Sequence, residues 1–260
     1  MTHPIILCFS GHDPSGGAGI QADIETLASQ NCHTCSIITA LTEQNSHNVK
    51  KLLPQKAEDI YRQAVTLLAD FKINAIKIGL IGHPDIVTVI RAILDDCPNV
   101  PVVLDPVLAA GGGTSLASAS LIQKMQSKLL PKTTVLTPNS QEARRLTGQT
   151  DLNDCADQLL DFGCQSVLIT GTHEQTDSVI NTLFRPGISP EYFQWSRLPE
   201  EYHGSGCTLA SAITARIALG DELVSACYNA QEYTWNALYQ GFKPGTGQHH
   251  PNRLFWNRKI

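Results

Sequence analysis

The chain has 260 residues, of which 42% are hydrophobic and 17% charged, with a net charge of −5. This acidic balance is not typical of proteins that bind nucleic acid, and no apolar run approaches the roughly 20 residues that span a bilayer. The first residues, MTHPIILCFS, lack the basic region of a signal peptide, so we expect a cytoplasmic protein. No linker or repeat divides the sequence, so we expect one domain over residues 1–260.

Short apolar runs alternate with helical patterns through most of the sequence. Strands are predicted at 4–10, 34–41, 74–81, 101–107, 134–139 and 166–171, and helices at 17–30, 56–70, 84–95, 117–129, 139–147 and 152–163. Runs that are apolar at nearly every position are typical of a parallel sheet covered on both faces. Two antiparallel edge strands at 177–184 and 191–197 and helices at 205–219 and 222–240 follow. The pattern predicts an α/β fold, a three-layer α/β/α sandwich with a mostly parallel central sheet.

The eight cysteines are expected to be free thiols, because the cytoplasm is reducing. Cys32 and Cys35 form a C-x-x-C motif, but it leads into a β-branched run instead of a helix, and no second pair stands at zinc-site spacing. We interpret both as small hydrophobic residues at the start of a strand.

Polar residues follow the ends of the predicted parallel strands. In open α/β sheets, ligands bind beyond the carboxyl ends of the strands. Asp105 follows one strand, and Asn139 and Glu142 follow the next. We expect these three side chains to face one crevice.

The first glycine-rich segment, GHDPSGGAGIQAD, resembles two nucleotide-binding motifs. As a P-loop it fails, because Gly17 and Ala18 stand where Lys and Ser or Thr are required. Gly17, Gly19 and Ala22 fit the dinucleotide fingerprint G-x-G-x-x-A, with Glu43 at the distance of a ribose-binding acid. An NAD-dependent dehydrogenase therefore stays open as an alternative, although HDPS separates the strand from the first matching glycine.

The second glycine-rich segment, HGSGCTLASA, comes directly before a predicted helix. The N–H groups of Ser205, Gly206 and Cys207 can converge after Gly204 and bind a phosphoryl group during its transfer. A helix N-terminus lowers a thiol pKa from about 8.5, so we expect a thiolate that takes the proton of a substrate hydroxyl. The alternative interpretation is a glycine turn with a buried cysteine.

From end to end, the chain resembles the hydroxymethylpyrimidine/phosphomethylpyrimidine kinases of thiamine biosynthesis, a branch of the ribokinase-like superfamily. The resemblance rests on GHDPSGGAGIQADIETL, SIITALTEQN, IKIGLIG, VVLDPV, TPNSQEARRL, HGSGCTLASAI and GFKPGTGQHH. It implies a ribokinase-like fold without a large separate lid domain, ATP and Mg²⁺ as cofactors, and a homodimer. Cys207 stands where most sugar kinases of the superfamily have the catalytic aspartate.

The resemblance also implies roles for individual residues. Gln44 is expected to recognise the aminopyrimidine edge, since a carboxamide offers both a donor and an acceptor. Glu142 and Asp105 are expected to hold magnesium. The other expected substrate-binding residues are Gly11, Asp13, Asp23, Leu80 and Val107, and the expected nucleotide-binding residues are Asn139, Thr170 and Gly171.

Departures from the family pattern concentrate on the nucleotide side. Gly111 and Gly112 replace the Lys or Thr and the Ser of the usual loop after DPV, and Thr170 replaces a lysine that can reach a nucleotide phosphate. Leu80 replaces a methionine beside the expected ring pocket. The altered nucleotide side leaves open a pyrimidine-binding protein with reduced kinase activity. A pyridoxal-type kinase also stays open, because the resemblance includes relatives with this cysteine that phosphorylate the hydroxymethyl group of pyridoxal.

Overall fold

The computed structural model describes residues 3–257, in which nine strands form one sheet in the order β3-β2-β1-β4-β5-β6-β7-β8-β9. The six strands from β2 to β7 in this order run parallel, whereas β3, β8 and β9 pair antiparallel with their neighbours. The strands are β1 Ile5–His12, β2 His33–Gln44, β3 Val49–Pro54, β4 Ala75–Ile78, β5 Val102–Leu104, β6 Val135–Leu136, β7 Val167–Ile169, β8 Ser178–Arg185 and β9 Ile188–Ser196.

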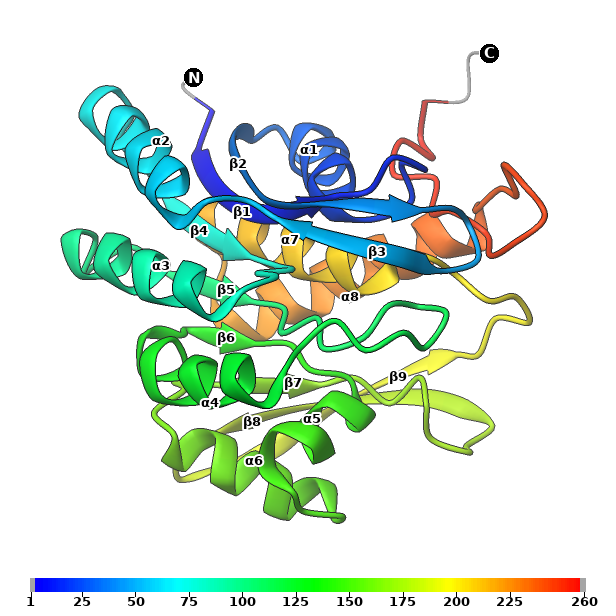
Figure 1. Cartoon of the computed structure of the whole chain (residues 1–260). Helices are drawn as coiled ribbons and strands as arrows, with labels where there is room; N and C mark the ends of the chain where they lie inside the picture. The colour runs from blue at the N-terminus through cyan, green and yellow to red at the C-terminus, as the bar shows by residue number, and fades with distance from the viewer. Residues whose placement is uncertain (1–2, 258–260) are drawn as a thin grey trace.

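Helices cover both faces of this sheet (Figure 1). The helices are α1 Gly19–Ser29, α2 Ala57–Asp70, α3 Pro84–Asp96, α4 Ala119–Lys128, α5 Ser140–Thr147, α6 Leu152–Asp161, α7 Ser205–Ala218 and α8 Leu223–Tyr239, with a 3₁₀ turn at Leu130–Lys132. Helices α2 to α6 pack on one face, and α1, α7 and α8 pack on the other. The predicted three-layer α/β/α sandwich is confirmed.

The central strands are apolar throughout because each face of the sheet has its own core. In β5, Val102 and Leu104 contribute to the core beneath α2 to α6, whereas Val103 between them packs in the core beneath α7 and α8. All three side chains are buried. Burial on both faces therefore removes the alternation of polar and apolar residues that a half-exposed strand would show.

The structure differs from the predicted pattern mainly at strand ends. β3 was not predicted, because its charged residues Lys50 and Lys51 are exposed, as is common on the edge of a sheet. β5 and β6 are shorter than predicted. Pro106 and Pro138 follow them closely and have no N–H for a strand ladder, so the chain turns there towards the carboxyl edge of the sheet.

The cysteines agree with the expectation from the sequence. All eight are free, and Cys32 and Cys35 are buried at the beginning of β2. Among residues 3–257, no helix combines the length and the apolar character that crossing a bilayer requires.

Candidate active site

A cleft of about 610 Å³ opens at the carboxyl ends of the parallel strands, beside the N-terminus of α7. It brings together most of the residues expected from the sequence. Those that line it are Gly11, Asp13, Gln44, Leu80, Asp105, Val107, Asn139, Glu142, Thr170, Gly204, Ser205, Gly206 and Cys207. The cleft therefore joins the expected substrate, metal and nucleotide residues in one space.

Two expected residues do not line the cleft. Asp23 on α1 is fully buried and bonded to neighbouring side chains, so its expected contact with a substrate is corrected. Gly171 donates its N–H to Asn181 Oδ1, and a Cβ at this position would lie 2.2 Å from the carbonyl oxygen of Ile180. Gly171 is therefore required for close packing against β8, and its contact with the nucleotide stays a prediction.

The turn before α7 depends on a glycine. Gly204 is the N-cap of α7 with a φ of 87°, which disfavours residues with a side chain. A Cβ here would lie 1.9 Å from the carbonyl oxygen of Gly17, so the two glycine-rich segments touch backbone to backbone. The first N–H groups of a helix have no partner within it, and those of Ser205, Gly206 and Cys207 border the cleft. The turn has the geometry of an anion site.

Arg253, from the segment after α8, ties the two glycine-rich segments together. Its side chain is buried, and its Nε donates to Thr208 Oγ1 at 3.0 Å in the first turn of α7. Nη2 donates to the carbonyl oxygen of Gly17, and Nη1 pairs with Glu25 of α1 at 2.9 Å. One guanidinium therefore fixes α1, α7 and the first glycine-rich segment relative to one another.

The environment of Cys207 contradicts the expected thiolate. Burial raises the pKa of its thiol to about 12, and the nearby charges of Asp105 and Asp23 raise it further. The charge of Lys77 and a hydrogen bond from the N–H of Gly19 act in the opposite direction but are outweighed. The helix N-terminus therefore does not make this thiol acidic, and Cys207 is a neutral thiol that donates to the Asp105 carboxylate.

A buried ammonium group beneath the cleft was missed in the sequence. Lys77 on β4 is completely buried, and its Nζ lies 2.9 Å from Asp23 Oδ1 and 3.1 Å from Ser10 Oγ. Ser211 of α7 donates to the same Asp23 oxygen at 2.7 Å. Burial lowers the pKa of Lys77, but the negative groups around it outweigh burial, so the lysine stays charged. A lone lysine in the apolar run NAIKIGLI was the signal that could have revealed it.

Asp105 and Glu142 form a buried acidic pair. Burial raises the pKa of both carboxyl groups, and the charge of Asp105 adds to the shift of Glu142. Two desolvated carboxylates suit a divalent cation, and Mg²⁺ usually takes one or two carboxylates and completes its shell with water and phosphate oxygens. Among residues 3–257 there is no cluster of three or more His, Cys, Asp or Glu that could hold a metal.

Asn139 and Glu142 are held in place by a capping box at the start of α5. Asn139 Oδ1 accepts the N–H of Glu142 at 2.9 Å, and Glu142 Oε2 accepts the N–H of Asn139 at 3.0 Å. Glu142 Oε1 accepts the N–H of Leu108 at 3.0 Å. Val107, next to Leu108, has a φ of 35°, which is rare for a β-branched residue and common at functional sites. The strained turn after β5 is thus anchored to the acidic pair.

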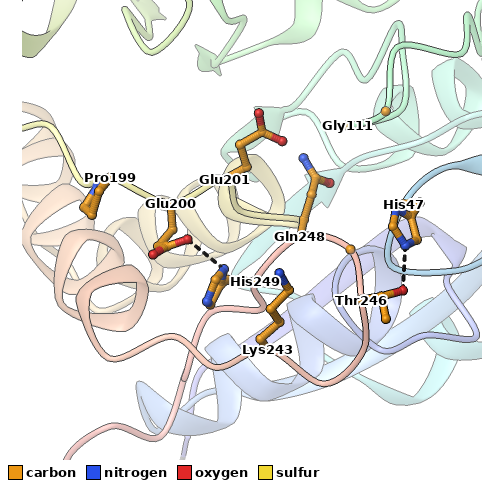
Figure 2. Close-up of a pocket in the computed structure, with 11 residues that line it drawn as sticks. His47, Gly111, Pro199, Glu200, Glu201, Lys243, Thr246, Gln248 and His249 are labelled. Carbon is orange, nitrogen blue, oxygen red and sulfur yellow. Dashed lines mark hydrogen bonds and ion pairs between the residues drawn. The ribbon is translucent and has the colours of Figure 1, made fainter.

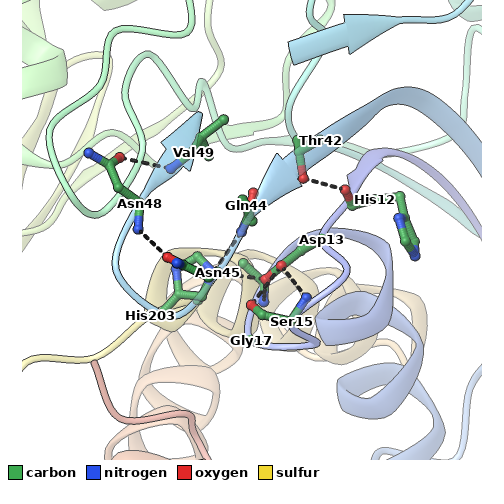
Figure 3. Close-up of polar contacts among 12 residues, drawn as sticks. His12, Asp13, Ser15, Gly17, Thr42, Gln44, Asn45, Asn48, Val49 and His203 are labelled. Atoms are coloured by element: carbon green, nitrogen blue, oxygen red, sulfur yellow. Dashed lines mark hydrogen bonds and ion pairs between the residues drawn. The ribbon is translucent and has the colours of Figure 1, made fainter. Parts of the chain in front are cut away.

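The cleft also carries a chain of polar contacts (Figure 3). The Gln44 amide lies 3.0 Å from His203 Nε2, and the same nitrogen lies 2.8 Å from Asp13 Oδ2. The pairing of β2 with β3 has a bulge, since Glu43 pairs with Lys51 but Gln44 pairs with Val49. Bulges redirect side chains next to functional sites. His203 was not assigned a role from the sequence.

The glycines after β5 have a packing reason. A Cβ on Gly112 would lie 2.3 Å from the carbonyl oxygen of His47, and one on Gly111 would lie 2.9 Å from Gln248 Oε1. Asn48 Nδ2 also donates to the carbonyl oxygen of Gly112 at 3.1 Å. A smaller cavity of about 390 Å³ lies between these segments and shares Gly111 and Gln248 with the cleft (Figure 2). The loop therefore packs on the β2–β3 turn, which follows Gln44 in the chain.

The chain is similar to known proteins over most of its length. Residues 13–252 match the family model described as phosphomethylpyrimidine kinase. The hydroxymethylpyrimidine/phosphomethylpyrimidine kinase of Streptomyces coelicolor is 35% identical, over 95% of this chain and 93% of that protein. The corresponding kinase of Bacillus subtilis is 32% identical, over 97% of this chain and 95% of that protein.

Solved structures extend the comparison to the fold. An ADP complex of Bacillus subtilis pyridoxal kinase is 28% identical, with a TM-score of 0.89 over 97% of this chain and 98% of that one. Phosphomethylpyrimidine kinase of Clostridium difficile is 30% identical, with a TM-score of 0.78 over 90% of this chain and 98% of that one. These likenesses confirm the ribokinase-like fold, with no separate lid domain. The chain belongs to the phosphomethylpyrimidine kinase family.

Proposed function

We propose that this kinase uses ATP to phosphorylate 4-amino-5-hydroxymethyl-2-methylpyrimidine and then its monophosphate, in thiamine biosynthesis. The observation that carries the proposal is the arrangement of the cleft. The anion-binding turn with Cys207, the acidic pair Asp105 and Glu142, and Gln44 all line this one space. This is the arrangement that transfer of a phosphoryl group to a ring-bound hydroxymethyl group requires.

Phosphoryl transfer demands mainly positioning and charge stabilisation, and the residues of the cleft fit both demands. The N–H groups of Ser205, Gly206 and Cys207 would stabilise the transferred group. Lys77 lies beneath the cleft, where its charge is paired with that of Asp23 at 2.9 Å. Asp105 and Glu142 would hold Mg²⁺, which when bound neutralises negative charge on the nucleotide phosphates.

The neutral state of Cys207 changes its proposed part in the reaction. With a pKa of about 12, the thiol holds its proton near neutral pH and so is a poor general base. We therefore assign it a contact with the substrate oxygen and with Asp105. A loose transition state needs little help from a base, because the hydroxyl proton is lost late.

The nucleotide would lie on the side of Asn139 and Thr170, both of which line the cleft. Thr170 supplies no positive charge there. The nearby loop after β7 is held by Arg197, whose guanidinium donates to the carbonyl oxygens of Thr172, at 2.8 Å, and Glu174, at 2.9 Å. We expect weaker ATP binding than in relatives with a lysine at position 170.

A pyridoxal-type kinase is the second candidate, and one observation favours it. Pyridoxal kinase of Staphylococcus aureus, solved in complex with pyridoxal, superposes with a TM-score of 0.89 and is 26% identical to this chain.

Family resemblance further supports a homodimer and a cytoplasmic location, and the single continuous sheet supports one kinase domain. Size-exclusion chromatography with light scattering would test the dimer.

ATP consumption tests the proposed function directly. The enzyme is incubated with Mg²⁺ and ATP and, in separate reactions, with hydroxymethylpyrimidine, its monophosphate and pyridoxal. We expect turnover with both pyrimidines and a large loss in Cys207→Ala. Cys227→Ala is the matched control, because Cys227 is a buried thiol on α8 away from the cleft. Turnover with pyridoxal alone would replace the proposal by its alternative, and no turnover with any acceptor would leave a binding protein.

A further inference from the structure

The contacts among Gln44, His203 and Asp13 restrict where hydrogen atoms can be. The three side chains come from β2, from the segment before α7 and from the first glycine-rich segment (Figure 3). His203 Nε2 is shared between Gln44, at 3.0 Å, and Asp13 Oδ2, at 2.8 Å. A ring nitrogen either carries a hydrogen and donates it, or lacks one and accepts. It cannot do both, so the partner that requires a donor or an acceptor fixes which of the two Nε2 is towards the other partner.

Asp13 makes that decision, because it can only accept. Its Oδ1 accepts the N–H of Ser15 at 2.8 Å and the Ser15 hydroxyl at 2.7 Å, and its Oδ2 accepts the N–H of Ala18 at 2.9 Å. Burial raises the pKa of Asp13, but hydrogen bonds from His203 and Ser15 outweigh burial and lower it to about 2. Asp13 is therefore an ionised acceptor at neutral pH, and His203 Nε2 carries the hydrogen that it donates to Asp13.

This hydrogen determines which end of the Gln44 amide faces the histidine. The lone pair of a protonated Nε2 belongs to the ring π-system and cannot accept an N–H from the amide. The oxygen and nitrogen of an amide exchange places by a half-turn about the Cγ–Cδ bond, at almost the same positions. The structure places Gln44 Nε2 at 3.0 Å from His203 Nε2, where two N–H groups would face each other. Only the half-turn that brings Oε1 to this position gives an attractive contact, in which Oε1 and Asp13 share the Nε2 hydrogen. The remaining edge of the amide then has a fixed order of donor and acceptor.

A fixed order matters for the ring that we propose as substrate, and in this sense the inference rests on the proposed function. On this pyrimidine the acceptor N3 and the donor 4-amino group are neighbours, and the hydroxymethyl group is on the next carbon, C5. An amide edge of the opposite order would pair with the same ring only after the ring is turned over. Turning the ring over would move the hydroxymethyl group to the opposite side of the amide. It would then lie away from the position that it occupies when the amide has the order fixed by His203.

We propose that His203, held by Asp13, is a positioning residue that fixes the orientation of the Gln44 amide and thereby the orientation in which an aminopyrimidine ring binds. His203 would then act on the reaction without touching the reacting atoms. It would also make the site selective for rings whose edge offers an acceptor beside a donor in this order.

A pair of ring analogues tests this proposal. The 4-oxo analogue, 5-hydroxymethyl-2-methylpyrimidin-4-one, has N3–H as donor and O4 as acceptor, which reverses the order of the 4-amino ring. Equilibrium dissociation constants of both are measured by calorimetry, together with kcat and KM, for the wild type, His203→Phe and His250→Phe. His250→Phe is the matched control, because its ring lies 5.7 Å from the ring of His203, whereas its buried Nε2 has no hydrogen-bond partner among residues 3–257.

We expect the wild type to prefer the 4-amino ring by about 10-fold to 100-fold, the cost of mismatched buried hydrogen bonds. In His203→Phe the amide is free to turn, so the preference is expected to fall to within about threefold, whereas His250→Phe keeps it. Equal weakening of both rings by His203→Phe would indicate a purely structural role and overturn the proposal. An equal loss of preference in His250→Phe would overturn it as well.

A second measurement does not depend on any variant or on turnover. Long-range ¹⁵N–¹H correlation spectra of the wild type report which ring nitrogens of His203 are protonated. A protonated Nε2 at pH 7 is expected, and an unprotonated Nε2 would overturn the inference. Failure of the wild type to bind either ring would instead overturn the proposed function, so the two failures are distinguishable.

Discussion

The contact between Gly204 and Gly17 leads to a sharp prediction for Gly204→Ala. The added methyl group would have to keep a φ of 87°, which costs a residue with a side chain roughly 1–2 kcal/mol. It would also lie 1.9 Å from the carbonyl oxygen of Gly17, whereas ordinary contact begins near 3.4 Å. The two segments must therefore move apart by about 1.5 Å. A displacement of that size at a catalytic turn costs about 100-fold in rate.

Gly220 provides the matched control at the other end of the same helix. It has a φ of 95°, and a Cβ there would meet nothing within 4 Å. Gly220→Ala thus carries the backbone cost without the clash. We expect it to lower Tm by a few degrees at full kcat, and Gly204→Ala to lower both Tm and kcat. Thermal unfolding and steady-state kinetics measure the difference. Equal effects of the two substitutions, with kcat retained, would refute the argument that close packing shapes the anion site.

Three further predictions concern charge. Lys77→Met leaves Asp23 buried without its counter-charge and is expected to lower the free energy of unfolding by about 3–5 kcal/mol in urea titrations. The pKa of Asp13 is lowered to about 2 in the folded state. Its ionised form therefore contributes about 2 kcal/mol to the free energy of unfolding above pH 4, and this contribution is lost as the pH falls towards 2. In urea titrations at a series of pH values, Asp13→Asn is expected to lack this loss of stability. Because the pKa of Cys207 is raised to about 12, its alkylation by iodoacetamide, followed by mass spectrometry, is expected to be slow at pH 7 and to rise steadily to pH 10.

Each of these experiments has its own check. Replacing both partners, in Lys77→Met with Asp23→Leu, should restore part of the stability lost in the single variant, because no charge is left unpaired. Superimposable acid profiles of the wild type and Asp13→Asn would show that Asp13 is not held ionised by its donors. Alkylation of Cys207 ahead of the half-buried Cys97 at pH 7 would contradict the neutral thiol.

The architecture and the location of the cleft could be predicted from the sequence because both follow from local patterns. Buried strands are apolar throughout, and polar residues such as Asp105 and Asn139 follow their ends, where parallel strands place ligands. Asn139 and Glu142, which were expected to face the same crevice as Asp105, line the cleft with it. These features need only residues that are close together in the chain.

Contacts between distant residues could not be predicted in this way. Lys77 and Asp23 are 54 residues apart, and Gln44 and His203 are 159 apart, so neither pair forms a motif. For Cys207, the sequence supplied the local effect of a helix N-terminus, but tertiary burial has the opposite and larger effect on its pKa. Gly112 was noted only as a replacement of the usual Ser, because its packing against the carbonyl oxygen of His47 cannot be seen without the fold.

The contacts of Arg253 with Gly17 and Thr208 have a consequence for folding. Its partner Gly17 lies 236 residues away in the chain, and Thr208 lies 45 residues away. Closing such long loops is entropically expensive, so contacts of this kind form late, after local helices and neighbouring strands. The anion site would therefore be assembled only when β1, α1 and α7 have already docked. A partly folded chain would carry a recognisable sheet and no phosphoryl-binding turn, which makes catalytic activity a stringent reporter of complete folding.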